Sequence, residues 1–193
     1  MKVSCKTIVN HLFMMICIII MAEVSGYFWH KYVAHLGYLG DTIRITHYCH
    51  HEEIYPYNNI ESVKYHTSHD SWPWLILYFL IMGIVYIVYK MKKINKSNFR
   101  FILIFGTLYA YMIDSTHASF HIKGHWLNNF AYYRKQKKVH YIHHFDNVNY
   151  GIIFPWFDML FGTYKDKHKN IKFDVFDGFE SECKDRIKFF DFL

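Results

Sequence analysis

Histidine is concentrated in four short segments of this chain, and the spacing inside them could bring several imidazoles together. Residues 47–51 read His-Tyr-Cys-His-His, and residues 140–144 read His-Tyr-Ile-His-His. On a helix, side chains at i, i+3 and i+4 share one face, so each segment would present three imidazoles together. A histidine pair accompanies each triplet. The ten candidate ligands are His30, His35, His47, His50, His51, His117, His121, His140, His143 and His144.

Imidazoles clustered in this way predict a metal site. Neutral imidazole is the commonest metal ligand in proteins, and it suits Zn, Cu, Fe or Ni. One pair at helical spacing would carry little weight, but here ten of the 15 histidines follow a doubled pattern. Because one metal takes about four to six ligands, the ten imidazoles predict two metal ions.

Two carboxylates are expected to support these imidazoles. Asp114 lies one helical turn before His117, and Glu23 lies two turns before His30. Each carboxylate could accept a hydrogen bond from the far ring nitrogen of a liganding imidazole and so fix its tautomer. We therefore predict this role for Asp114, with Glu23 as a further candidate.

The spacing of His30 and His35 is unusual, because i and i+5 do not share one face of a regular helix. Either the two side chains bind different metal ions, or the helix ends between them. Two further histidines, His66 and His69, belong to no cluster and are predicted to lie on the surface.

Three apolar stretches must position these clusters: residues 8–29, 72–89 and 99–115. Each is close to the length of about 20 residues that crosses a bilayer as a helix. They predict an all-α integral membrane protein with about three membrane helices in a single domain, 1–193. The first stretch follows Lys2 and Lys6 and could also be a cleaved signal peptide. The lack of a small-residue cleavage site, and the nearness of His30, favour a retained helix.

The order of the spans predicts that all four clusters lie on one side of the membrane. The first span ends at His30, and the other two form a hairpin that begins after His51 and ends before His117. The metal-site segments, 30–71 and 114–164, then share one side. A charged tail, 165–193, follows them. We place this side in the cytosol, where metal and reductant are available. The distribution of Lys and Arg on the two sides of the spans gives little indication of which side faces the cytosol.

The composition agrees with a membrane protein rather than a nucleic-acid-binding protein. The chain is 52% hydrophobic and carries a formal net charge of +6. A positive charge suits either anionic lipid or nucleic acid. The lysines are scattered between apolar spans and no nucleic-acid motif is present, so we expect no nucleic-acid partner.

Taken together, the motifs resemble the membrane-bound fatty acid hydroxylase/sterol desaturase superfamily over roughly residues 23–164. In this family a basic residue usually follows the first histidine of the motif, and Lys31 is similar to it. The family usually also has a Glu four residues before that histidine. Gly26 stands at this position here, and Glu23 is the nearest carboxylate that could substitute for it. The resemblance rests on His30-Lys31-x3-His35, His47-x2-His50-His51, His117-x3-His121, His140-x2-His143-His144, Asn149-Tyr150-Gly151 and Trp156-Phe157-Asp158-x2-Phe161-Gly162-Thr163-Tyr164.

The motif Asp114-x-Thr116-His117-x3-His121 is most similar to the fatty acid 2-hydroxylases. The resemblance implies an O2-dependent lipid hydroxylase with two histidine-bound iron ions (Fe2+/Fe3+), for which zinc could substitute. It implies oxidation of an acyl chain near its headgroup end. Electrons would come from an external donor such as cytochrome b5 and its reductase. The expected location is the endoplasmic reticulum in a eukaryotic or viral context, and the cytoplasmic membrane in a bacterial one.

Two other functions stay open from the sequence. A sterol or carotenoid oxidase or desaturase would keep every histidine and change the apolar pocket. A non-enzymatic membrane metal-binding protein would instead be expected to carry ionisable ligands along its spans.

Overall fold

The computed structural model describes residues 5–66 and 71–167. The regular secondary structure of this part of the chain is helical apart from one isolated bridge between Ser62 and Ile122. Three long helices dominate it: α1 (Cys5–Phe28), α3 (Ser71–Lys90) and α4 (Lys96–Phe120). The predicted all-α class is confirmed. His69, and the predicted tail from residue 168 onward, lie outside the described residues.

The long helices have the composition of a membrane anchor. Many of their large apolar side chains are exposed, among them Phe13, Phe79 and Leu108. Two segments, Thr7–His35 and Ser71–Lys90, are long and apolar enough to cross a membrane. The third predicted span forms within α4, whose charged residues near both ends lower its mean hydropathy.

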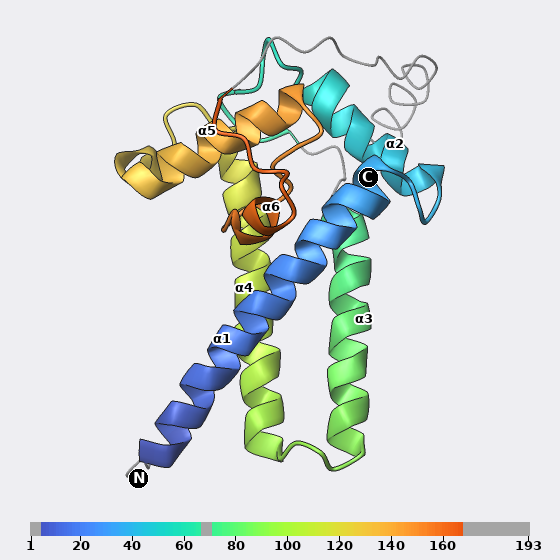
Figure 1. Ribbon diagram of the computed structural model, residues 1–193, viewed down its shortest axis with the longest axis vertical. Helices are drawn as coiled ribbons and strands as arrows, with labels where there is room; N and C mark the ends of the chain where they lie inside the picture. Colours follow the sequence, from blue (N-terminus) through green and yellow to red (C-terminus); the bar gives the residue numbers. More distant parts are fainter. Residues whose placement is uncertain (1–4, 67–70, 168–193) are drawn as a thin grey trace.

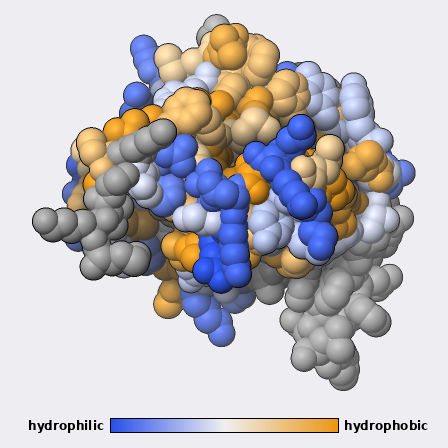
Figure 2. All heavy atoms as spheres, turned by 90° about the horizontal axis from the view of Figure 1, so that it is seen from below, coloured by the Kyte–Doolittle hydropathy of each residue, from blue (hydrophilic) through white to orange (hydrophobic). Residues whose placement is uncertain are grey.

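Helices α3 and α4 form the predicted hairpin, and α4 packs against both α1 and α3. The side chain of Asn95 caps α4 by accepting a hydrogen bond from the backbone N–H of Asn98 at 2.9 Å. The turn before α4 lies at the lower end of the molecule in Figure 1. Figure 2 views this end and shows hydrophilic side chains between hydrophobic ones. The exposed basic residues in and next to the turn between α3 and α4 are Lys90, Lys92, Lys93, Lys96 and Arg100.

The shorter elements gather at the opposite end, where α1 finishes, α3 begins and α4 finishes (Figure 1). Helices α2 (Asp41–Cys49), α5 (Ala131–Phe145) and α6 (Trp156–Leu160) lie there, with the π-helices η1 (Trp29–His35) and η2 (His50–Ile54) and the 3-10 helix η3 (Trp126–Asn129). These elements, the last turn of α4 and the residue that follows it, His121, carry all ten clustered histidines. The prediction that the clusters share one end of the spans is therefore confirmed.

Candidate metal centre

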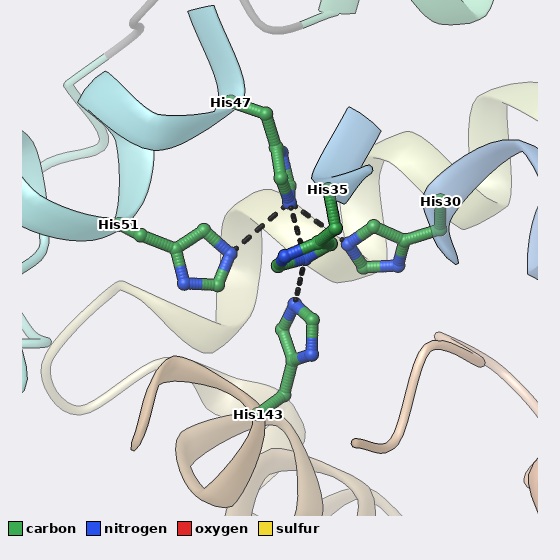
Figure 3. A group of neighbouring side chains, drawn as sticks. All are labelled: His30, His35, His47, His51 and His143. Atoms are coloured by element: carbon green, nitrogen blue, oxygen red, sulfur yellow. Dashed lines mark hydrogen bonds between the residues drawn. The ribbon is translucent and has the colours of Figure 1, made fainter. Parts of the chain in front are cut away.

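The clustered histidines form two neighbouring groups, and within each group the potential ligand atoms lie within 4.8 Å of one another. Figure 3 shows the first group, in which five rings from η1, α2, η2 and α5 point toward one centre. The first group is His30, His35, His47, His51 and His143; the second is His50, His117, His121 and His140. Each group could hold one metal ion.

His144 lies against both groups. Its Nε2 atom is 3.2 Å from Nε2 of His140, in the second group. Its ring stacks on that of His51, in the first group, with 4.1 Å between centroids. The tenth predicted ligand thus adjoins the second group and packs against the first.

A π-helix explains the spacing of His30 and His35. Residues 29–35 continue α1 as η1, in which backbone hydrogen bonds join residues i and i+5. The wider turn brings the two rings to 5.1 Å between centroids and places both in the first group. Both expectations, separate metals or a helix end, were therefore wrong, because each assumed a regular α-helical turn.

The two histidine triplets each contribute to both groups. From the first triplet, His47 and His51 join the first group and His50 joins the second. From the second triplet, His143 joins the first group and His140 the second. Three imidazoles on one helical face can therefore serve two adjacent metal positions, a division that the spacing alone did not predict.

Backbone carbonyls orient four of the imidazoles. A carbonyl oxygen can only accept, so the Nδ1 atom facing it carries the ring proton, and Nε2 keeps its lone pair. The sequence offered no signal for these partners, because every residue has a carbonyl. The pairs are His30 with Tyr150 at 2.7 Å, His121 with Ile60 at 2.9 Å, His143 with Val148 at 2.6 Å and His144 with Tyr55 at 3.0 Å.

The resulting crowding of Nε2 atoms fits a bound cation. Nε2 of His47 lies 3.0 Å from Nε2 of His30, 3.0 Å from that of His35 and 3.1 Å from that of His51. In the second group, Nε2 of His140 lies 3.1 Å from that of His121. One ring nitrogen can donate to one neighbour only, so most of these contacts would set lone pair against lone pair. Ligand nitrogens about 2.0–2.1 Å from a shared metal would stand roughly 3 Å apart, as these do.

Burial keeps these imidazoles in the neutral form that binds metal. It lowers the pKa of His143 well below the ordinary value of 6.5, and it lowers the pKa of His144 to about 3. Removing an imidazolium from water is costly, so the uncharged ring prevails at neutral pH. Deprotonated ligands are a requirement for metal binding, and the site supplies them.

The two predicted carboxylates form hydrogen bonds with other groups. Glu23 is buried and accepts from the hydroxyl of Tyr109 at 2.6 Å and from the backbone N–H of Phe154 at 3.3 Å, which links α1 to α4 and to the segment before α6. Asp114 is exposed and accepts from the hydroxyl of Ser71 at 3.0 Å. A direct role of either carboxylate in orienting an imidazole stays a prediction.

A third carboxylate, Asp158, supports the site indirectly. It is buried and accepts from the backbone N–H groups of Tyr150 at 2.8 Å and Gly151 at 2.7 Å, and from the hydroxyl of Thr163 at 2.7 Å. These bonds hold the loop whose Tyr150 carbonyl accepts from His30. In the sequence, Asp158 stood out only as part of the motif at residues 156–164, which carries the resemblance to the family together with residues 149–151.

An apolar cavity of about 420 Å³ extends from the histidines into the anchor. Its walls come from α1, α3 and α4, and they are mainly aliphatic. His30 and His47 of the first group and His117 of the second line one end of it, together with Asp114. An apolar molecule in this cavity would therefore lie next to both groups.

Fold and site together define a helical membrane protein with histidine-rich metal-binding groups at the end of an apolar cavity. The fatty acid hydroxylase family model matches residues 15–163, and the chain belongs to this family. No curated protein and no solved structure matches the chain. The family and the histidine groups support an enzyme with a lipid hydroxylase type of function. The closer similarity to 2-hydroxylases stays a prediction.

Proposed function

We propose that the protein is an O2-dependent lipid hydroxylase that uses two histidine-bound iron ions to oxidise an acyl chain near its headgroup end. The observation that carries this proposal is the opening of both imidazole groups onto one apolar cavity. A metal pair that served only structure would need no such cavity. Family membership supports the same class of reaction.

Iron is the metal that suits this reaction. Insertion of one oxygen atom from O2 into a C–H bond, with the other leaving as water, consumes two electrons and two protons. Iron bound by imidazole supplies that redox chemistry, whereas zinc has none and could only occupy the ligands. The ten predicted histidines would hold the metals, and an external donor such as cytochrome b5 with its reductase would supply the electrons.

The protein's own residues position the reactants and exclude water. Carbonyl groups of Tyr150 and Val148 fix the rings of His30 and His143, so the ligand atoms need no reorganisation. The aliphatic walls hold the lipid chain and keep bulk water away from the reacting carbon. We place the site at the membrane surface of a multi-pass protein, because the histidines begin where the spans stop, and on the cytosolic side, because metal and reductant are available there.

The cavity also distinguishes this proposal from metal transport. A carrier is expected to place ionisable ligands along the path through the membrane. The acidic and imidazole side chains that line this cavity all lie at its histidine end: His30, His47, Asp114 and His117. The remaining lining residues include no carboxylate and no imidazole, although Cys17 and three methionines contribute sulfur atoms.

Expression of the protein with a cytochrome b5-type reductase system, followed by mass spectrometry of total lipids, tests the proposal. We expect 2-hydroxylated acyl chains with the intact protein and none with His143→Ala. Hydroxylated sterols with unchanged acyl chains would instead indicate the sterol-oxidising branch. A metal-loaded protein that oxidises no lipid would contradict the assignment as an oxygenase.

A further inference from the structure

The cavity is long in the direction of the helices. Its lining on α1 and the beginning of η1 extends from Met14 to His30, which is about 24 Å at roughly 1.5 Å per residue. On α4 it extends from His117 to Ile102, or about 22 Å. Both lengths approach the thickness of a hydrocarbon core, about 30 Å. A molecule that fills the cavity must therefore be extended along the spans.

The two ends of the cavity differ in polarity. The end farthest from the histidines is lined by Met14, Val85 and Ile102, whose one hydrogen-bonding atom, the weakly accepting sulfur of Met14, already accepts from Nδ2 of Asn10 at 3.4 Å. At the histidine end, Asp114 lines the cavity, is exposed, and is hydrogen-bonded to Ser71. A polar headgroup would lose its hydrogen bonds at the far end, whereas a headgroup that carries an N–H or O–H group could donate to Asp114 at the histidine end.

Small residues make room between these ends. Gly106 of α4 lines the cavity and is buried, and a Cβ atom placed there would meet only Cε of Met82, at 3.5 Å. Gly106 lies eleven residues before His117, about 16 Å from the histidine end. A larger side chain at this position would obstruct the cavity below that depth while leaving the part near the metals open.

We propose, on the basis of the function proposed above, that the cavity binds one acyl chain with its methyl end toward Met14 and its polar end beside Asp114. In this arrangement Gly106 determines how long a chain the cavity accepts. The carbons presented to the histidines are then those near the polar end. The chain, held by the spans, is bound before any oxidation takes place, so binding and activity can be measured separately.

The substitution Gly106→Leu tests the role of this glycine in selecting chain length. Purified protein is incubated with a mixture of saturated fatty acid amides of different lengths, whose amide N–H groups can donate to Asp114, and the retained chains are identified by mass spectrometry. We expect the variant to lose the longest chains and to keep the shorter ones. Gly83→Leu is the matched control, because Gly83 lies within α3, is exposed, has nothing within 4 Å of a Cβ atom and does not line the cavity.

An unchanged chain distribution in Gly106→Leu, or an equal shift in both leucine variants, would overturn this role. If Gly106→Leu does not fold, Met14→Ala provides an independent test at the far end. Removing the Met14 side chain deepens the cavity, so the retained chains should shift toward longer ones. No shift with this variant would equally overturn the proposal.

Photo-crosslinking tests the orientation of the chain. Two fatty acid amide probes are compared, one with a diazirine near the methyl end and one with a diazirine near the amide end. The first should label α1 and α4 near Met14 and Ile102, and the second should label α4 near Asp114 and His117. Reversed or absent labelling overturns the inference.

These readouts separate the inference from the proposed function, since neither requires oxidation. Correct labelling by a protein that oxidises no lipid would refute only the proposed function. Acyl oxidation accompanied by reversed labelling would refute only the inferred orientation.

Discussion

At the scale of single residues, the proposed metal centre depends on which ring nitrogen carries the proton. Backbone carbonyls fix that choice for His30, His121, His143 and His144. The sequence identified all ten clustered histidines, because their spacing is visible in the chain. It could not identify the carbonyls of Tyr150 or Val148, because backbone acceptors have no residue signature.

His143→Ala should remove metal from the first group. Losing a supporting partner of a ligand typically costs about 10–100-fold in affinity, so losing a ligand should cost more. We expect metal affinity to fall by more than about 100-fold and activity to be lost, while membrane insertion is retained. The matched control is His66→Ala, because His66 is exposed and belongs to neither group. Equal losses in both variants would show that the site is larger than these groups.

Asp158→Asn tests the indirect support of His30. The substitution replaces one of the two accepting oxygens with an amide donor, so either Tyr150 or Gly151 loses the acceptor of its backbone N–H group. We expect a loss of about 10–100-fold in metal affinity, measured by titration of metal-depleted protein. Asp41→Asn, at an exposed carboxylate of α2, should have no effect on affinity. Unchanged affinity in Asp158→Asn would show that the loop holds its form without this carboxylate.

Acid should destabilise the metal-depleted protein. Burial lowers the pKa of His143 and His144, in the latter case from 6.5 to about 3. Between these values the unfolded chain binds more protons than the folded chain, so stability falls as the pH falls below 6.5. Each such histidine lowers the free energy of unfolding by about 1.4 kcal/mol for every unit by which the pH falls in this range. Thermal unfolding in detergent should show a Tm that decreases from pH 7 to pH 5, and a constant Tm would contradict the buried neutral state.

At the scale of elements, apolar stretches of the sequence predicted α1, α3 and α4 closely. The predicted spans 72–89 and 99–115 lie within Ser71–Lys90 and Lys96–Phe120. The π-helices were not predicted, because helical pattern analysis assumes 3.6 residues per turn. In hindsight the His30–His35 spacing is itself the signal, since i and i+5 meet only on the wider turn.

The hairpin makes a prediction about membrane sidedness. Ser97 lies at the start of α4, and Lys123 follows its end, beside the histidine groups. Both residues are exposed, so a cysteine at either position can be labelled. Ser119, at the end of α4, is unsuitable for labelling, because it is buried and accepts a hydrogen bond from Tyr133. Ser97→Cys and Lys123→Cys should therefore react with an impermeant thiol reagent from opposite sides of the membrane. Modification of both from the same side would contradict α4 as a membrane span.

At the scale of the whole molecule, the spans and the metal groups form one functional unit. The helices that anchor the protein also wall the cavity, and the histidines close one end of it. The sequence predicted the anchor and the site as neighbours, with the apolar spans leading a lipid to the metals. It could not predict the length of the cavity, which depends on how α4 packs between α1 and α3 and on small residues such as Gly106.

The central claim is that the two imidazole groups bind two iron ions, and metal analysis tests it most directly. Protein is produced under iron-replete conditions, purified in detergent, and analysed for metal and protein in the same sample. We predict two iron ions per chain, because the ligands divide into two groups that each suffice for one ion. A ratio at or below one metal ion per chain would contradict the dinuclear site.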